Sequence, residues 1–89
     1  MNIGMIGLGN LGTAVGNLIA ANGHDVLGWE HDPAVAREIQ EKHFNTRYLP
    51  GIPLHAGLRS TTDLAAVMQE SRVVFIWKVW QFKVGNFSA

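Results

Sequence analysis

Short apolar runs alternate with amphipathic stretches along the chain. Residues 2–7 form an apolar run with hardly a polar side chain, which is typical of a strand buried on both faces of a sheet. From residue 10 to residue 22 the apolar positions recur every three or four residues, as they do along one face of a helix, and Gly23 follows as a C-terminal stop. The pattern therefore predicts a strand followed by a helix of about three turns.

The alternation continues through the rest of the chain. A second apolar run covers residues 26–29, and Asp32 and Pro33 then supply an N-cap and a first helical residue for a helix that ends near Lys42. Two prolines and a glycine within residues 48–53 remove hydrogen-bond donors and favour turns, so a loop is predicted there. Three further elements are predicted: a strand over 58–61, a helix over 63–70 capped at Thr62 and Asp63, and a buried strand over 73–77.

The turn between the first strand and the first helix reads GLGNLGTA, a G-x-G-x-x-G motif within residues 7–14. After a strand and before a helix, Gly7 makes the tight turn, Gly9 lets the backbone approach a pyrophosphate, and Gly12 allows the helix to pack closely on the strand. The helix N-terminus then presents free N–H groups to the phosphates. Glycine makes up 10 of the 89 residues, so the spacing alone is weak evidence and a purely structural turn is the alternative. The context favours a dinucleotide site.

In dinucleotide-binding units an acidic residue about twenty positions beyond the glycines, at the end of the second strand, holds the ribose hydroxyls. Glu30 occupies that position, and the alternative is an exposed acid at a strand end with no ligand. Strands and helices in this order need right-handed crossovers, which give a parallel sheet. We therefore expect one α/β domain, a Rossmann-type parallel sheet of about four strands in the order 3-2-1-4, with helices on both faces.

Composition narrows the choice of partner. Seven basic and seven acidic side chains balance, so the chain lacks the basic surface of a nucleic-acid-binding protein and the polybasic patch of a membrane-binding one. The sequence has no cysteine, no apolar run long enough to span a membrane and no signal-peptide pattern at its start. Its histidines show no spacing typical of metal ligands. We expect a cytoplasmic protein that binds a small-molecule dinucleotide, NAD or NADP, and no metal, nucleic acid or membrane.

Several motifs together resemble the N-terminal part of the NAD(P)-dependent glycerol-3-phosphate dehydrogenases. They are the glycine motif, the Asn-Gly-His of residues 22–24, the Trp-Glu-His-Asp-Pro of 29–33, the NTRYLPGIPL of 45–54 and the TTDL of 61–64. Many families share the glycines, whereas the YLPG loop followed by TTDL is far more specific. The resemblance implies an oxidoreductase that transfers hydride between NAD(P)H and dihydroxyacetone phosphate and gives sn-glycerol 3-phosphate for phospholipid synthesis.

The resemblance also implies roles for individual residues. Asn10 and Leu11 contact the cofactor in the family, although Leu11 stands where an aromatic residue is usual. His31 corresponds to the basic residue after the second strand, and Tyr48 corresponds to the tyrosine of the loop. Phe82 corresponds to part of a turn beside the nicotinamide. The family has a proline in this turn, and this chain does not. The predicted cofactor-binding residues are Gly7, Gly9, Asn10, Leu11, Gly12, Glu30, His31, Tyr48 and Phe82.

Cofactor preference is expected to be weak. His31 carries an imidazole, which gains charge close to neutral pH and then favours a 2′-phosphate, whereas the Glu30 carboxylate repels one. The two residues act in opposite directions at the same end of the second strand.

In the family, the remainder of the nucleotide domain and a helical domain with the catalytic lysines follow the matched part, and this chain stops at Ala89. Residues 1–89 are therefore expected to be the N-terminal part of a dinucleotide-binding domain, with an incomplete sheet, no catalytic residues and no activity alone. Residues 73–84 are β-prone and aromatic, and in an incomplete sheet they would leave an exposed edge open to self-association. Two alternatives stay open: part of a 3-hydroxyisobutyrate-type dehydrogenase, whose GLGNMG is close to GLGNLG, and a non-catalytic nucleotide-binding module or remnant.

Overall fold

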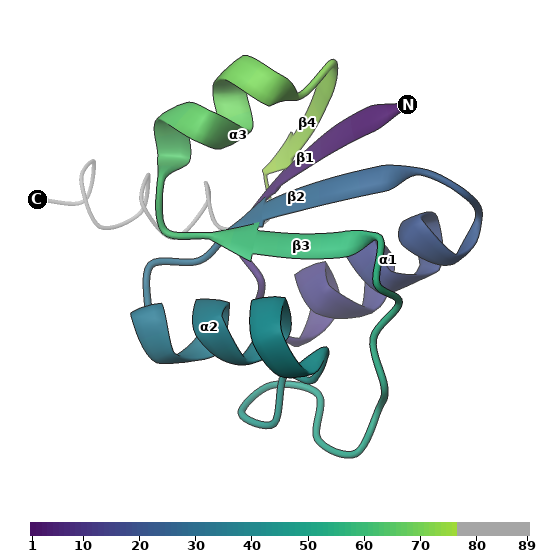
Figure 1. Cartoon of the computed structure of the whole chain (residues 1–89), viewed down its shortest axis with the longest axis vertical. Helices are drawn as coiled ribbons and strands as arrows, with labels where there is room; N and C mark the ends of the chain where they lie inside the picture. The colour runs from purple at the N-terminus through teal and green to yellow at the C-terminus, as the bar shows by residue number, and fades with distance from the viewer. Residues whose placement is uncertain (77–89) are drawn as a thin grey trace, which may run out of the picture.

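The computed structural model describes residues 1–76 of the chain, and they form the predicted series of alternating strands and helices (Figure 1). The strands are β1 (Asn2–Ile6), β2 (Asp25–Trp29), β3 (Leu58–Thr61) and β4 (Val73–Ile76). The helices are α1 (Asn10–Ala21), α2 (Pro33–Lys42) and α3 (Leu64–Glu70). These bounds agree with the predicted ones to within a residue or so. The predicted last residue of the final strand, Trp77, lies outside the described residues.

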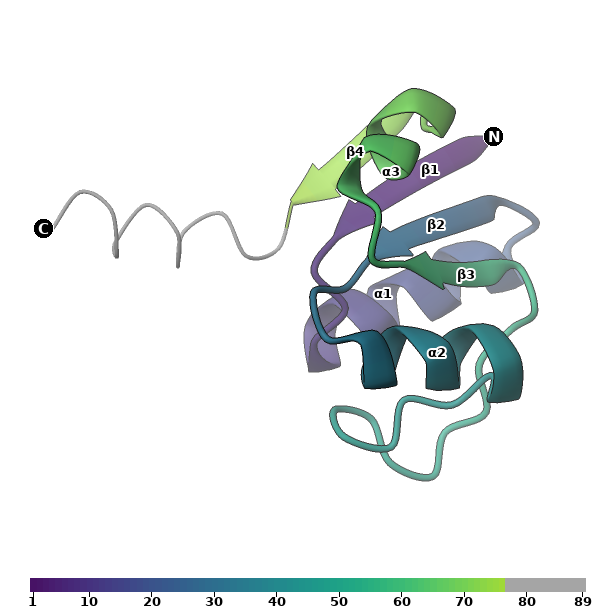
Figure 2. The ribbon, with the colours of Figure 1, turned by 60° about the vertical axis from the view of Figure 1, so that its left-hand side comes forward.

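The four strands pair in parallel in the order β3-β2-β1-β4, which confirms the predicted order and the α/β class. Figure 2 shows α1 and α2 on one face of the sheet and α3 on the other, so the helices cover both faces as predicted. Residue Ile6 of β1 lies opposite Trp29 of β2. The carboxyl ends of these two central strands are therefore neighbours, and the segments that leave them begin side by side.

The central strand β1 is buried because a helix approaches it closely from each side. On the first face, a Cβ atom at Gly16 of α1 would lie 3.2 Å from the Met5 sulfur. On the other face, a Cβ atom at Gly4 would lie 2.9 Å from Val67 Cγ1 of α3. Because glycine has no side chain, the helix and the strand can pack closely at each of these contacts.

The main core lies between the sheet and the two helices α1 and α2. Its buried cluster draws on β1, β2, β3, both of these helices and the loop that follows α2, and its members are Met5, Leu8, Ala20, Val26, Val35, Ile39, Leu54 and Leu58. On the opposite face, α3 has one buried residue, Val67. Most of the apolar burial of residues 1–76 is thus concentrated on the α1/α2 face.

The prediction that residues 73–77 form a buried strand is wrong for the part that the structure describes. Val73, Phe75 and Ile76 of β4 are 42%, 41% and 48% exposed. The reason is position, because β4 is an edge strand that pairs with β1 on one side. An apolar run alone does not distinguish a central strand from an edge strand. No helix within residues 1–76 is long and apolar enough to cross a membrane.

Candidate functional site

The glycine turn, residues 7–12, leads from the carboxyl end of β1 into α1. Gly7 has a φ of 104°, which side chains disfavour, and its N–H donates to the Trp29 carbonyl at 3.0 Å. Gly9 is the N-cap of α1, with extended backbone, and a Cβ atom there would meet nothing within 4 Å apart from Gly9 itself and its chain neighbours. Gly12 is buried in the first turn of α1. The turn therefore brings the backbone to an open space in front of the helix.

The N-terminal end of α1 has no conventional cap for the backbone N–H groups of its first turn. No side chain of residues 1–76 caps the helix at Gly9, so its first amides lack the oxygen that a capping Ser or Asp supplies. Asn10 partly compensates, because its Oδ1 accepts from the Leu11 N–H at 2.7 Å. The Leu11 side chain itself is exposed. The positive end of the helix dipole is thus available to an anion.

Glu30 follows β2 directly and lies beside the start of the glycine turn. The alternative of an exposed acid is wrong, because Glu30 is fully buried, with its N–H donating to the Thr61 carbonyl of β3 at 3.0 Å. Its Oε2 accepts from the Asp32 N–H at 3.0 Å and lies 3.1 Å from His31 Nδ1. Its Oε1 has no hydrogen-bond partner among the described residues. A buried carboxylate oxygen in this state favours an external donor, such as a hydroxyl.

The other predicted site residues are placed differently. The His31 side chain is 60% exposed beside Glu30, and its ring centroid lies 6.2 Å from that of Trp29. Tyr48 is half-buried against the core cluster, and the Arg47 guanidinium carbon lies 5.4 Å from the centre of its ring. Phe82 lies outside the described residues. The structure therefore gathers the glycines, Glu30 and His31 at one edge of the sheet, with Tyr48 on the loop that follows α2.

Sequence reasoning missed two buried polar residues that connect this loop to the glycine turn. The Asn45 side-chain amide donates to the Leu8 carbonyl at 3.0 Å and to Thr13 Oγ1 at 2.8 Å. The Thr13 hydroxyl in turn donates to the same Leu8 carbonyl at 3.0 Å. No local pattern marks Asn45, because its partners lie 37 and 32 positions away.

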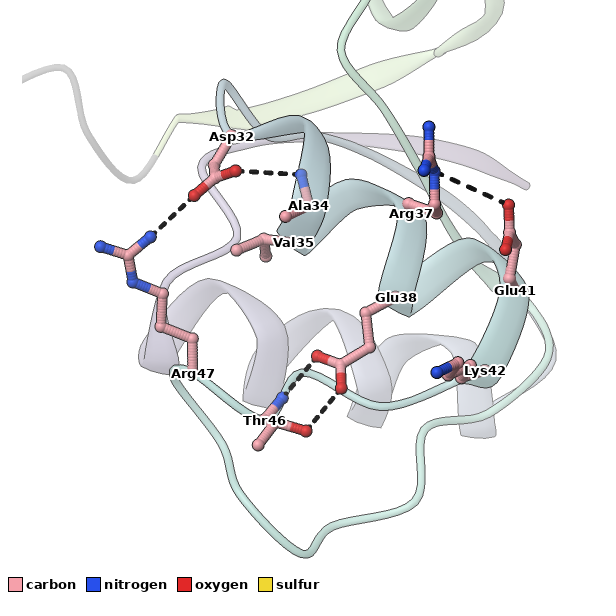
Figure 3. Close-up of a pocket in the computed structure, with 9 residues that line it drawn as sticks. All are labelled: Asp32, Ala34, Val35, Arg37, Glu38, Glu41, Lys42, Thr46 and Arg47. Atoms are coloured by element: carbon pink, nitrogen blue, oxygen red, sulfur yellow. Dashed lines mark hydrogen bonds and ion pairs between the residues drawn. The ribbon is translucent and has the colours of Figure 1, made fainter.

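A separate cavity of about 630 Å³ lies between α2 and the loop that follows it (Figure 3). Figure 3 shows that its charged side chains largely satisfy one another: Arg47 donates to Asp32 at 2.7 Å and Thr46 donates to Glu38. The hydroxyl of Thr46, and then its backbone N–H, hold the pKa of Glu38 below its ordinary value of 4.5. The residues that line this cavity include none of the glycine turn. Its mixed and mutually paired charges do not suit a pyrophosphate.

The described residues offer a ligand both hydrogen-bond donors and an acceptor. Within residues 1–76 no group of three or more His, Asp or Glu side chains is placed to hold a metal ion. The N–H groups at the uncapped helix end can donate to phosphate oxygens, and the buried Glu30 carboxylate can accept from a hydroxyl one strand away. The N–H donors of α1 and the carboxylate acceptor of Glu30 are adjacent because β1 and β2 are paired.

Comparison with known proteins gives one consistent family. A family model described as the NAD-dependent glycerol-3-phosphate dehydrogenase N-terminus matches residues 2–83. The chain is 43% identical over 74 residues to the glycerol-3-phosphate dehydrogenase (NAD(P)+) of Ectopseudomonas mendocina, a match that covers 83% of this chain and 22% of that protein. It is 51% identical over 67 residues to the protein of the same name from Desulfovibrio desulfuricans, covering 75% of this chain and 20% of that protein.

Solved structures agree with this result. The crystal structure of glycerol-3-phosphate dehydrogenase from Coxiella burnetii superposes with a TM-score of 0.78 and 31% identity, over 84% of this chain and 23% of that one. The structure from Plasmodium falciparum gives a TM-score of 0.79 at 23% identity, which supports the fold. The chain spans about a fifth of the length of the curated relatives that it matches.

Proposed function

This chain belongs to the NAD-dependent glycerol-3-phosphate dehydrogenase family, and on that premise we propose that residues 1–89 form the N-terminal part of a dinucleotide-binding domain. The membership decides against the 3-hydroxyisobutyrate-type alternative. In the proposal, the domain holds NAD or NADP for hydride exchange with dihydroxyacetone phosphate, in the cytoplasm, and the sn-glycerol 3-phosphate formed serves phospholipid synthesis. The observation that carries the proposal is the open, uncapped helix end at Gly9 beside the half-paired, buried carboxylate of Glu30.

The residues divide the work of binding. Gly7 makes the turn, Gly9 leaves room for the pyrophosphate, and the amides at Asn10 and Gly12 donate to its oxygens. The Leu11 amide joins them once the Asn10 side chain releases it. The bound cofactor supplies the hydride, and this chain's own residues bind and orient it. We include Tyr48 and Phe82 in the proposed site from the family resemblance.

Glu30 and His31 act at the ribose end of the proposed site. The free Oε1 of Glu30 accepts from a ribose hydroxyl, which satisfies a buried oxygen that has no partner within residues 1–76. His31 lies 3.1 Å from the other oxygen of the same carboxylate, so the imidazole and the carboxylate act in opposite directions on a 2′-phosphate. We expect the dissociation constants for NADH and NADPH to differ by less than about a hundredfold in isothermal titration calorimetry. A larger ratio would overturn the expectation of weak preference.

A single substitution tests the proposed pyrophosphate site, because its effects on stability and binding have opposite signs. Gly9→Ser supplies a capping hydroxyl to an N-cap with φ of −73° and no neighbouring atom within 4 Å, so α1 gains about 0.3 kcal/mol. The same hydroxyl occupies amides that the pyrophosphate needs, so the NADH dissociation constant rises at least about tenfold. Calorimetric titration and urea unfolding measure the two effects.

Ala14→Ser is the matched control, because it adds the same hydroxyl at an exposed position further along α1. We expect it to leave NADH binding within about twofold of that of the parent chain. The proposal is wrong if the parent chain binds no NADH, or if Gly9→Ser binds NADH as tightly as the parent.

We also propose that the β4 edge supports association with a second copy of the chain. Its exposed apolar side chains and its edge position favour strand pairing, and a net charge of zero gives little mutual repulsion. Sedimentation should show a concentration-dependent dimer that Val73→Lys abolishes. A monomer at all concentrations, or a dimer unaffected by Val73→Lys, would remove the proposal.

A further inference from the structure

The Leu8 carbonyl, in the middle of the glycine turn, is held by two buried donors. Thr13 Oγ1 and Asn45 Nδ2 each donate to it at 3.0 Å, and Asn45 Nδ2 gives its second proton to Thr13 Oγ1 at 2.8 Å. Leu8, Thr13 and Asn45 are all fully buried. Asn45 Oδ1 accepts from the Tyr48 N–H at 3.3 Å, which orients the amide with its nitrogen toward the turn.

The two hydrogen bonds to the Leu8 carbonyl determine the direction of the Gly9 N–H. The peptide bond between Leu8 and Gly9 is trans, so its carbonyl and its N–H point in opposite directions. Because the Leu8 carbonyl is directed into the buried network, the Gly9 N–H is directed away from it. Apart from Gly9 and its two chain neighbours, nothing lies within 4 Å of the Cβ position of Gly9, so the space beside this residue is open. The N–H is therefore held toward the exterior of the turn, at the place proposed for the pyrophosphate.

The turn needs such a restraint because of its glycines. Rotation of the Leu8–Gly9 peptide changes the φ of Gly9, and glycine accepts positive and negative φ about equally. Without its two donors, this peptide can flip and turn the N–H inward. Gly7, at a φ of 104°, adds further freedom on the other side of Leu8. The glycines that leave room for the ligand thus also allow the backbone N–H groups that bind it to change direction.

We propose that Asn45 is a positioning residue for the cofactor: by holding the Leu8 carbonyl, it keeps the Gly9 N–H aimed at the pyrophosphate. The inference rests on the proposed function and deepens it. Asn45 lies on the loop after α2, and its own carbonyl accepts from the Leu49 N–H at 2.8 Å. The loop therefore reaches the pyrophosphate site through a buried hydrogen bond, with no contact between Asn45 and the ligand required.

The test compares the full chain with Asn45→Ala and Thr13→Val. Asn17→Ala is the matched control, because Asn17 Oδ1 holds the same loop through the His55 N–H at 2.7 Å and does not bond to Leu8. Two readouts are needed. Residual dipolar couplings of the Gly9 N–H bond, in two alignment media and without ligand, report its orientation. Calorimetric titrations with NADH and with adenosine, which lacks the pyrophosphate, report binding.

We expect Asn45→Ala to reduce the Gly9 coupling by more than about half and to weaken NADH binding about tenfold, with adenosine binding within about twofold of the parent. Thr13→Val should give the same pattern, and Asn17→Ala should change neither readout by more than about twofold. If Asn45→Ala does not fold, Thr13→Val decides by the same criteria.

The inference is overturned if a folded variant keeps the parent coupling or the parent NADH affinity, or if Asn17→Ala shows an equal loss. A parent chain that binds no NADH removes the proposed function. In that event the couplings of the free protein still decide whether Asn45 orients the Gly9 N–H.

Discussion

The two faces of the sheet are built differently. On the α1/α2 face, the buried cluster joins three strands, two helices and a loop, and the glycine turn and Glu30 lie at its edge. On the α3 face, a helix of seven residues buries Val67 alone, while Leu64 and Met68 remain exposed next to an exposed β4. One face therefore carries both the core and the proposed ligand site.

This difference indicates that the proposed site depends on the core through specific contacts. Leu8 is the clearest case: its side chain belongs to the buried cluster, and its carbonyl anchors the network of Thr13 and Asn45. A disturbance of the α1/α2 face therefore reaches the turn directly through Leu8, whereas α3 packs against β1 at Gly4, before the turn begins.

Truncation of a core residue should separate the two faces most clearly. Leu58→Ala removes a fully buried side chain from the α1/α2 core and should lower the free energy of unfolding by about 3 kcal/mol. Met68→Ala removes a side chain that is 54% exposed on α3 and should lower it by less than about 0.5 kcal/mol. Urea unfolding followed by circular dichroism measures both. Equal losses would show that the faces contribute alike.

Overpacking beneath the glycine turn should have the next largest effect. A Cβ atom at Gly28 of β2 would lie 2.5 Å from Leu8 Cδ1, so Gly28→Ala should lower the free energy of unfolding by about 2 kcal/mol. In a Leu8→Ala background the obstacle is absent, and the same substitution should be nearly neutral. The double-mutant cycle therefore gives a coupling energy of about 1 kcal/mol or more. Additive effects would contradict the contact between Leu8 and β2.

Loss of the α3 cap should be local. Asp63 Oδ1 accepts from the Ala66 N–H at 3.3 Å at the start of α3, so Asp63→Ala should destabilise this helix by about 1 kcal/mol. Amide hydrogen exchange should show lost protection in α3 and unchanged protection in α1. A uniform loss in both helices would mean that the two faces open together.

Glu38 should contribute a small, pH-dependent stability on the α1/α2 side. Thr46 donates two hydrogen bonds to its carboxylate, which lowers the pKa of Glu38 in the folded chain. A lowered folded pKa gives stability that is complete above the unfolded value near 4.5 and is lost as the pH falls through the folded value. Unfolding measured across this acidic range should depend less on pH in Glu38→Gln than in the parent chain. Identical pH profiles for Glu38→Gln and the parent chain would show that Glu38 makes no pH-dependent contribution to stability.

The sequence pattern predicts most of the fold because local signals carry it. The Asp32-Pro33 start of α2, the turn at Gly23 and the apolar runs of β1 and β2 are readable without knowledge of their partners. The strand order follows from the crossover rule and the glycine motif. The same order places the fourth strand at an edge and so indicates the exposure of β4, although the apolar run of residues 73–77 taken alone predicts burial.

The candidate site is predictable only in part. Gly7 and Gly9 are visible in the motif, and a glycine inside the apolar run at Gly28 is itself a signal of close approach. The burial of Glu30 and the role of Asn45 depend on contacts across the fold, with Thr61 for the former and with Leu8 for the latter. Such contacts leave no mark in the neighbouring sequence.

Mapping where NADH binds would test the assignment of the glycine turn as the dinucleotide site. Titration of the ¹⁵N-labelled chain with NADH should shift the amide resonances of Gly9, Asn10 and Glu30, and leave those of α3 in place. Shifts that gather on the far half of α2, around Arg37 and Lys42 of the separate cavity, or on α3 and β4, would contradict the assignment of the glycine turn as the dinucleotide site.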